Sequence, residues 1–247
     1  LQRWQRVTNV MIYKKIGCIE LEKLRVIHLF EADFNLMVGI LFGRRAIYNS
    51  HDKHKLHKDQ YSRPSGECKD VAFAKQMHSH ASSYTRIPMG MFESDATACF
   101  DRIVMGFALA CFRAFGAPTT PLTTWEQTLY NIIHNIKTGY GSSKLTYKYT
   151  TDCPIIGPGQ GSRAACAACT MTTSILLKAM DKLANGLTFL APDKKVVYHT
   201  KAKMFVDDKT GYNNDFMRWI KNYPTPNDVR ELPVSYTHLT LPTMCVV

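Results

Sequence analysis

The sequence contains no hydrophobic run long enough to cross a membrane. Its longest uninterrupted apolar run, Ile103 to Phe112, has ten residues and includes a glycine, whereas a membrane-spanning helix needs about 20 residues. A secretory leader is also missing, and the chain begins with Leu1 rather than methionine. We therefore expect a fragment of an intracellular protein, of the nucleus or the cytoplasm, without a membrane partner.

Zinc-binding and disulfide patterns are equally scarce. The eight cysteines are scattered along the chain, and only Cys166 and Cys169 form a C-x-x-C. No second C-x-x-C and no H-x-x-x-H follows, so the pattern does not favour a zinc site. In an alanine-rich segment we interpret this pair as small packing residues, and all the cysteines as reduced thiols.

Acidic residues are few relative to basic ones. The chain has 20 Asp and Glu against 31 Lys and Arg, which gives a net charge of +11. Such an excess favours a polyanionic partner, nucleic acid before anionic lipid, although a basic enzyme of another kind fits too. The 45% hydrophobic and 11% aromatic content excludes disorder over most of the length.

Hydrophobic spacing predicts a mixed α+β fold, in which a small antiparallel sheet is backed by helices. We expect helices over residues 33–50, 67–82, 100–111 and 163–183. A further helix is expected to open with a capping box at 123–126 and to end at Gly139. Strands are expected at 88–93 and, half-buried, at 145–149, and residues 196–212 are typical of a hairpin with two aspartates at its tip.

Three short clusters carry the residues suited to chemistry. They are D-A-T-A-C-F-D at 95–101, G-P-G-Q-G-S at 157–162 and F-V-D-D at 205–208. Taken singly, an aspartate before a helix is usually an N-cap and an Asp-Asp pair is usually a turn. Together, Asp95, Asp207 and Asp208 could converge, and their carboxylates would then repel one another unless cations neutralised them. This predicts a site for two Mg²⁺ ions, with Mn²⁺ as an alternative, that supports phosphoryl transfer.

The order of these clusters resembles motifs A, B and C of reverse transcriptases, the RNA-directed DNA polymerases. The segments R-V-I-H-L-F-E-A-D-F-N (25–35) and Q-Y-S-R-P (60–64) are similar to finger motifs of the same family, and the likeness covers about residues 20–220. Retroelement enzymes of the non-long-terminal-repeat and group II intron kinds are the most similar. The resemblance implies transfer of dNTPs to a DNA primer on an RNA template.

The resemblance also assigns roles around the metal ions. It implies that Asp95 and Asp207 bind both ions, that Asp208 lies beside them, and that the backbone carbonyl of Ala96 is a further metal ligand. Phe100 falls on the steric gate that excludes a ribose 2′-hydroxyl, although it also begins the apolar stripe of a predicted helix. The gate and the core interpretation of Phe100 both stay open at this point.

Nucleotide and template contacts follow from the same resemblance. Gln160 and Gly161 match the motif-B pair that lines the nucleotide pocket, and Arg25, helped by Lys23, matches the finger cation that holds the triphosphate. Arg63 matches a residue that contacts template or triphosphate. For Arg25, a solvated surface charge is the alternative interpretation.

The domain organisation implied is that of a right-handed polymerase without its thumb. Residues 1–87 would form part of the fingers, and residues 88–220 the palm with a finger-like insertion, followed by a truncated palm end at 221–232. The ten residues V-S-Y-T-H-L-T-L-P-T at 234–243 match translated DNA that resembles a sequencing-library adaptor. We expect 233–247 to be adaptor-derived and to contribute nothing to the fold.

Two alternative functions remain. Tyr61 precedes Ser62 without the family's usual intervening glycine, and Lys209 follows the catalytic pair. After the Q-G pair, the chain has Ala165-Cys166 where the family usually has a Gly-Pro or similar pair. These departures fit a catalytically decayed nucleic-acid-binding remnant. The glycines of 157–161 with Asp181 suggest a dinucleotide-binding oxidoreductase, but the full G-x-G-x-x-G and an alternating βαβ pattern are missing.

Overall fold

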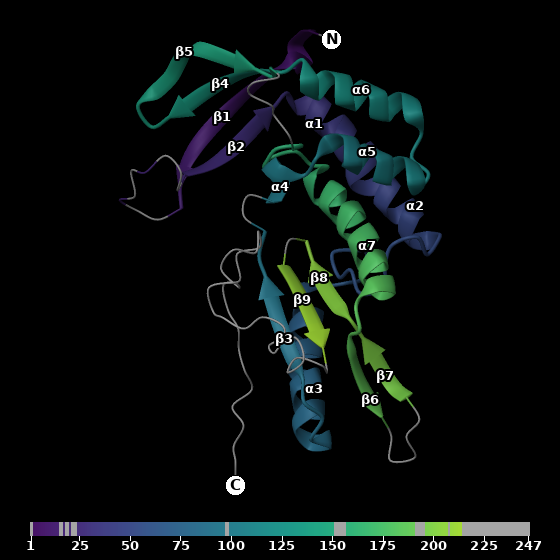
Figure 1. Ribbon diagram of the computed structural model, residues 1–247. Coiled ribbons are helices and arrows are strands. Elements are labelled where there is room, and N and C mark those ends of the chain that lie inside the picture. Colours follow the sequence, from purple (N-terminus) through teal and green to yellow (C-terminus); the bar gives the residue numbers. More distant parts are fainter. Residues whose placement is uncertain are drawn as a thin grey trace. The chain divides into compact units, whose positions relative to one another are not determined.

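The computed structural model (Figure 1) describes residues 2–14, 17, 20, 24–96, 99–150, 157–190, 196–206 and 208–213. The chain forms two compact units, each built from two segments. Unit 1 comprises Leu1–Lys55 and Ala98–Thr172, and unit 2 comprises Leu56–Thr97 and Thr173–Val247. Lys23, Asp207 and the predicted adaptor segment 233–247 lie outside the described residues, and the predicted fingers and palm boundaries stay a prediction.

Unit 1 contains a four-stranded mixed sheet. Its strands are β1 (Arg6–Tyr13), β2 (Leu24–Phe30), β4 (Ile133–Thr138) and β5 (Gly141–Lys148), in the order β2-β1-β4-β5. The pair β1–β4 is parallel, while β1–β2 and β4–β5 are antiparallel. The sheet therefore places the predicted finger segment on β2 beside β1.

Helices of unit 1 pack around one aromatic cluster. Ahead of the sheet lies the 3₁₀-helix η1 (Gln2–Gln5). After β2, the chain runs through α1 (Ala32–Val38), the π-helix η3 (Gly39–Ala46) and α2 (Ile47–Asp52), which confirms the predicted helical stretch at 33–50. The second segment gives α4 (Cys99–Arg102), α5 (Met105–Ala114) and α6 (Thr119–Tyr130).

Phe42 stacks on Trp125 at 4.7 Å and Phe112 meets Trp125 edge-on at 5.7 Å, so η3, α5 and α6 share this buried core.

Two helix predictions in unit 1 are wrong in detail. The predicted helix at 100–111 is interrupted, because α4 ends at Arg102 and α5 begins at Met105. The predicted capping box at 123–126 lies inside α6, which begins at Thr119 and ends at Tyr130. The isoleucines beyond Tyr130 form β4 instead, because β1 offers an edge with which they pair in parallel. Strand β5 is confirmed, but Leu145 is 82% exposed rather than half-buried.

Unit 2 contains the hairpin that carries the paired aspartates. Strands β3 (Gly90–Ser94), β9 (Asp208–Asn213) and β8 (Ala202–Phe205) form an antiparallel sheet in the order β3-β9-β8. Strands β6 (Leu187–Leu190) and β7 (Val196–Thr200) form a separate two-stranded sheet. The prediction of a small antiparallel sheet is confirmed, although β7 pairs with β6 and only β8 pairs with β9.

Two helices flank the sheets of unit 2. Helix α3 (Cys68–Thr85) confirms the helix predicted at 67–82, and it begins with a capping box between Glu67 and Asp70. The part of α7 (Ala165–Leu183) from Thr173 onward supplies Leu177, which packs with Ala202 and Met204 of β8. Across the described residues, no helix is long and apolar enough to span a membrane.

Candidate functional site

Two of the predicted catalytic aspartates lie at the same end of the sheet in unit 2. Strands β3 and β9 pair from Gly90↔Asn213 to Ser94↔Lys209. Asp95 directly follows Ser94, and Asp208 directly precedes Lys209, so the same register carried one residue further sets Asp95 opposite Asp208. Both side chains are exposed. The structure thus brings these two carboxylates to one sheet end; Asp207, the third, lies outside the described residues.

The turn between β8 and β9 has a strained backbone. Phe205 at the end of β8 pairs with Asp208 at the start of β9, so the chain reverses directly after Val206. Val206 has φ +55°, a left-handed conformation that a β-branched side chain adopts only at a cost of about 1–3 kcal/mol. Residues with positive φ are typical of such tight hairpin turns, so the strain comes with the sharp reversal that leads into Asp208.

The donors at this sheet end suit a hard divalent cation. Carboxylate oxygens are the ligands that Mg²⁺ prefers, and two exposed carboxylates at one place would repel each other without a cation. The described residues include no group of three His, Cys, Asp or Glu side chains placed to hold a metal. The predicted ligand set depends on Asp207 together with Asp95, Asp208 and the backbone of Ala96.

An additional segment pairs with β8 on its other edge. Gln60 forms a parallel bridge to Met204, in which Tyr61 N–H donates to the Met204 carbonyl at 2.8 Å and Met204 N–H donates to the Asp59 carbonyl at 3.0 Å. The predicted finger motif at 60–64 therefore lies directly beside the strand that leads into F-V-D-D. These backbone bonds fix the position of β8 from the side opposite β9.

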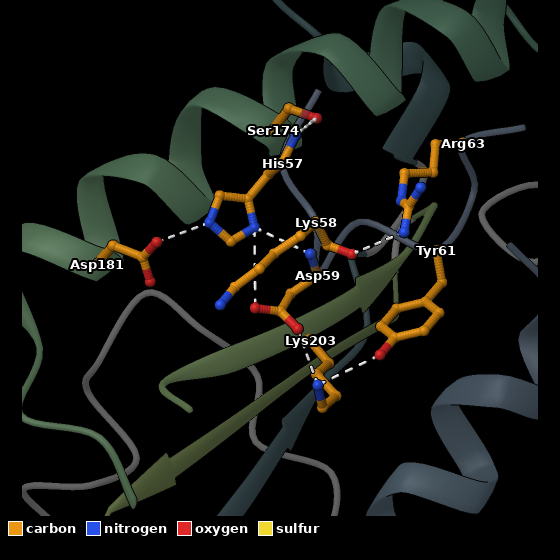
Figure 2. A network of polar contacts seen from close by, with 8 residues as sticks. All are labelled: His57, Lys58, Asp59, Tyr61, Arg63, Ser174, Asp181 and Lys203. Carbon is orange, nitrogen blue, oxygen red and sulfur yellow. Dashed lines mark hydrogen bonds and ion pairs between the residues drawn. The ribbon is translucent and has the colours of Figure 1, made fainter. Parts of the chain in front are cut away.

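A largely buried ion pair joins the same two segments, as Figure 2 shows. Lys203 of β8 is 3% exposed, and its Nζ donates to Asp59 Oδ1 at 2.8 Å and to the Tyr61 hydroxyl at 3.2 Å. Burial disfavours the ammonium charge, but the hydrogen bond and the negative charge of Asp59 outweigh it and hold the pKa of Lys203 above its ordinary value. Lys203 is thus charged and paired four residues before Asp207.

His57 connects the Asp59 segment to α7. Its Nδ1 accepts a hydrogen bond from Asp59 N–H at 3.1 Å, so its Nε2 carries the proton and donates to Asp181 Oδ2 at 2.7 Å. The His57 backbone N–H donates to Ser174 Oγ at 3.4 Å. Asp181 is therefore engaged with His57 within unit 2, although its side chain stays 48% exposed. In the dinucleotide-binding alternative it would have to share its carboxylate between His57 and a ribose.

Gln60 points into the protein, whereas Arg63 is half-buried and bonds to its own loop. Gln60 is fully buried; its amide donates to the Thr173 hydroxyl and its carbonyl accepts from Ser62 N–H at 3.0 Å. Arg63 donates to the Lys58 carbonyl at 3.3 Å. The residue expected to contact template or triphosphate thus contacts its own loop in this structure.

Unit 1 carries the predicted nucleotide-binding residues, and its glycine loop is held from three sides. The Gln160 carbonyl accepts from His28 N–H of β2 at 2.7 Å, and Gln160 N–H donates to Asp101 Oδ1 of α4 at 3.4 Å. Asn35 of α1 donates to the Gly161 carbonyl at 3.0 Å and accepts from Arg163 N–H at 2.8 Å. The motif-B pair is therefore fixed through its backbone.

Glycines make these close approaches feasible. A Cβ added to Gly161, where φ is +123°, would lie 2.3 Å from the His28 carbonyl oxygen, and one added to Gly157 would lie 2.0 Å from the Phe100 carbonyl oxygen. Any larger residue at either position would push the loop away from β2 or α4. The G-P-G-Q-G spacing thus has a packing cause.

The remaining predicted residues are placed as follows. Phe100 is half-buried on α4, so neither the gate nor the core interpretation is excluded by its exposure. Arg25 is exposed on β2, opposite Ile12 of β1. Lys23 lies outside the described residues. Asn35, His28, Asp59 and Lys203 are the residues around these motifs that the sequence did not single out.

Two imidazoles border a small cavity beside the glycine loop. The rings of His28 and His134 meet edge-on at 5.8 Å, next to a cavity of ≈ 20 Å³ that Gly159 also lines. Burial lowers the pKa of His28, and burial together with the nearby His28 lowers the pKa of His134 to about 4. Both rings are therefore neutral at pH 7, and His134 stacks on Tyr147 at 4.9 Å.

Comparison with known proteins gives a structural answer only. No protein-family model matches the sequence and no curated protein matches it. A solved telomerase from Candida albicans, in complex with a TWJ fragment of telomeric RNA, superposes with a TM-score of 0.58 at 11% identity, over 100% of this chain and 43% of that chain. A Candida tropicalis telomerase in complex with a TWJ fragment of telomeric RNA gives 0.58 at 12% identity, over 94% and 40%.

A third solved structure agrees. The apo telomerase of Candida tropicalis truncated from its C-terminal domain gives a TM-score of 0.56 at 13% identity, over 92% of this chain and 47% of that chain. The chain thus spans less than half the length of each of these proteins. At such identities the likeness concerns the fold, and it confirms the predicted mixed α+β fold, which this chain shares with these telomerases.

Proposed function

We propose that this chain is the fingers and palm of an RNA-directed DNA polymerase of the retroelement kind. The observation that carries the proposal is the sheet register that sets Asp95 of the first motif opposite Asp208 of the third. The shared fold with telomerases supports it. The net charge of +11 suits an RNA template and a DNA primer.

In this proposal Asp95, Asp207 and Asp208 hold two Mg²⁺ ions, aided by the carbonyl of Ala96. The ions, when bound, would activate the primer 3′-hydroxyl and stabilise the departing pyrophosphate. The chain's own part is to keep the carboxylates on a rigid sheet end. Strand β8 is fixed on one edge by β9 and on the other by the Asp59–Tyr61 segment, so the hairpin that carries the aspartates starts from a strand held on both edges.

The nucleotide-binding roles in unit 1 are part of the same proposal. The fixed loop of Gln160 and Gly161 would line the pocket of the incoming dNTP, with Phe100 excluding a ribose 2′-hydroxyl. Arg25, with Lys23, would bind the triphosphate, for which its exposure is a requirement. Arg63 would need to leave the Lys58 carbonyl before it could contact template or triphosphate.

Extension of a DNA primer annealed to an RNA template, with dNTPs and Mg²⁺, tests the proposal on the full chain. Asp95→Asn and Asp207→Asn should each lower extension at least about a hundredfold, because each removes a carboxylate that stabilises the developing charge through the metal ions. Asp52→Asn, an exposed carboxylate at the end of α2, is the matched control and should keep full activity.

Two results would overturn the polymerase function. Equal extension by wild type and Asp95→Asn would show that the carboxylates are not the ligands. Binding of the primer–template without any extension by the wild type would favour the nucleic-acid-binding remnant.

A further inference from the structure

Two cysteines of unit 1 face each other across different helices. Sγ of Cys99, on α4, lies 3.5 Å from Sγ of Cys169, on α7, and both residues are thiols. A disulfide needs about 2.05 Å between its sulfurs, so a shift of about 1.5 Å would close the pair. We propose that Cys99 and Cys169 are a redox modification site that closes to an intramolecular disulfide.

The arrangement favours this pair over the C-x-x-C that the sequence displays. Cys166 and Cys169 lie one turn apart on α7, yet Cys166 is exposed while Cys169 is 1% exposed and points to α4. Cys111 is buried on α5, and burial raises the pKa of its thiol, which makes it a poor nucleophile at neutral pH. Cys68 belongs to unit 2.

The partial exposure of Cys99 lets an oxidant reach one of the two thiols. Cys99 is of intermediate exposure, so it can attack glutathione disulfide as a thiolate, forming a mixed disulfide and releasing one glutathione. Sγ of Cys169 then attacks Sγ of Cys99, the mixed disulfide breaks, and a second glutathione leaves with the proton from Cys169. Two protein thiols are oxidised and one glutathione disulfide is reduced to two thiols.

The link would fix a segment that is already tightly packed. Helix α4 has only four residues, and it carries Phe100 between Cys99 and Asp101. The Phe100 carbonyl lies against Gly157 and the Asp101 carboxylate accepts from Gln160 N–H. A bond from Cys99 to α7 would hold this segment against both the glycine loop and the helix that follows it. Its consequence for dNTP selection rests on the proposed function; formation of the disulfide does not.

Oxidation of the full chain with glutathione disulfide tests the proposal. After alkylation of the remaining thiols and digestion without reductant, mass spectrometry should find a peptide pair that joins Cys99 to Cys169. Cys99→Ala and Cys169→Ala should each abolish the pair. Cys166→Ala, one turn away on the same helix, is the matched control and should leave it unchanged. A dominant Cys99–Cys166 link, or no link in wild type, would overturn the proposal.

A second readout covers the case in which a variant folds poorly. The disulfide would close a loop of 70 residues, so oxidation should raise the Tm of wild type and of Cys166→Ala by several degrees, reversed by dithiothreitol. An unchanged Tm despite a quantitative link would show that α4 is not held and would overturn the structural role. Failure of primer extension in the reduced protein would bear on the polymerase function alone.

Discussion

Two clusters of polar side chains, one in each unit, are in different chemical states. In unit 1, His28 and His134 are neutral imidazoles next to the glycine loop, and Asn9 donates to the Tyr147 hydroxyl in the same layer. In unit 2, Lys203 and Asp59 are buried as an ion pair beside the strand that leads to the paired aspartates. The first cluster stays uncharged because burial disfavours the protonated imidazoles, and the second stays charged because each ion neutralises the other.

This difference predicts which perturbation each cluster resists. Neutral imidazoles become unfavourable when acid would protonate them. Removal of one member of the ion pair should lower the free energy of unfolding strongly, because a lone buried charge remains. Removal of one neutral imidazole leaves no such charge.

The largest effect should come from breaking the ion pair on one side. Asp59→Ala leaves the Lys203 ammonium buried without its counter-charge, and we expect a loss of about 3–5 kcal/mol in the free energy of unfolding, measured by guanidinium titration. The double variant Asp59→Leu with Lys203→Met should cost much less, because no lone charge stays buried. A double variant as unstable as Asp59→Ala would contradict the role of uncompensated charge.

The next largest effect should be the loss of stability of the neutral imidazole cluster in acid. The pKa of His134 is about 4, below its ordinary 6.5, so the unfolded chain binds more protons between these values. Its contribution to stability is full above pH 6.5 and falls as the pH drops toward 4. His134→Phe keeps the ring that stacks on Tyr147 but cannot titrate. It should flatten the fall in unfolding free energy by up to about 1.4 kcal/mol per pH unit.

His78 of unit 2 complicates a bulk measurement, since burial and the charge of Lys203 lower its pKa to about 4 as well. The difference between the wild-type and His134→Phe curves isolates the unit 1 contribution. It is best followed by the fluorescence of Trp4 and Trp125, both in unit 1, in a Trp219→Phe background. Parallel curves would show that His134 is not neutral in the folded state.

The smallest effect should come from an exposed ion pair, which sharpens the contrast with Lys203. Lys69 and Glu67 are 2.7 Å apart, with side chains 76% and 60% exposed. Because water screens such a pair, Lys69→Ala should change the free energy of unfolding by no more than about 0.5 kcal/mol. A loss comparable to that of Asp59→Ala would mean that burial is not what makes the Lys203 pair strong.

Much of the architecture follows from local sequence signals. Helix α7 and the hairpin of β8 and β9 were predictable, because their apolar periods and turn residues lie within each segment. Strand β4 was not predictable from local signals, since Ile132, Ile133 and Ile136 fit the apolar stripe of a helix as well as a strand. The deciding partner is β1, which pairs Arg6 with Ile133 from far away in the chain.

The candidate site also contains residues that the sequence predicts and residues that it does not. The aspartates could be predicted because their motifs are contiguous, and the register of β3 with β9 places two of them together. The burial of Lys203 could not be predicted from the sequence, because a lysine in K-A-K-M-F is typical of an exposed strand face. Its partner Asp59 lies 144 residues earlier, and only the folded chain brings the two together.

Metal-directed cleavage tests whether Asp95 and residues 207–208 hold a shared metal site. Fe²⁺ replacing Mg²⁺, with ascorbate and peroxide, generates hydroxyl radicals that cut the backbone near the metal site. We expect cuts near Asp95 and near 207–208, suppressed together by excess Mg²⁺ and lost together in Asp95→Asn. Cuts that Mg²⁺ does not suppress, or cuts at one of the two segments only, would contradict a shared metal site on this sheet.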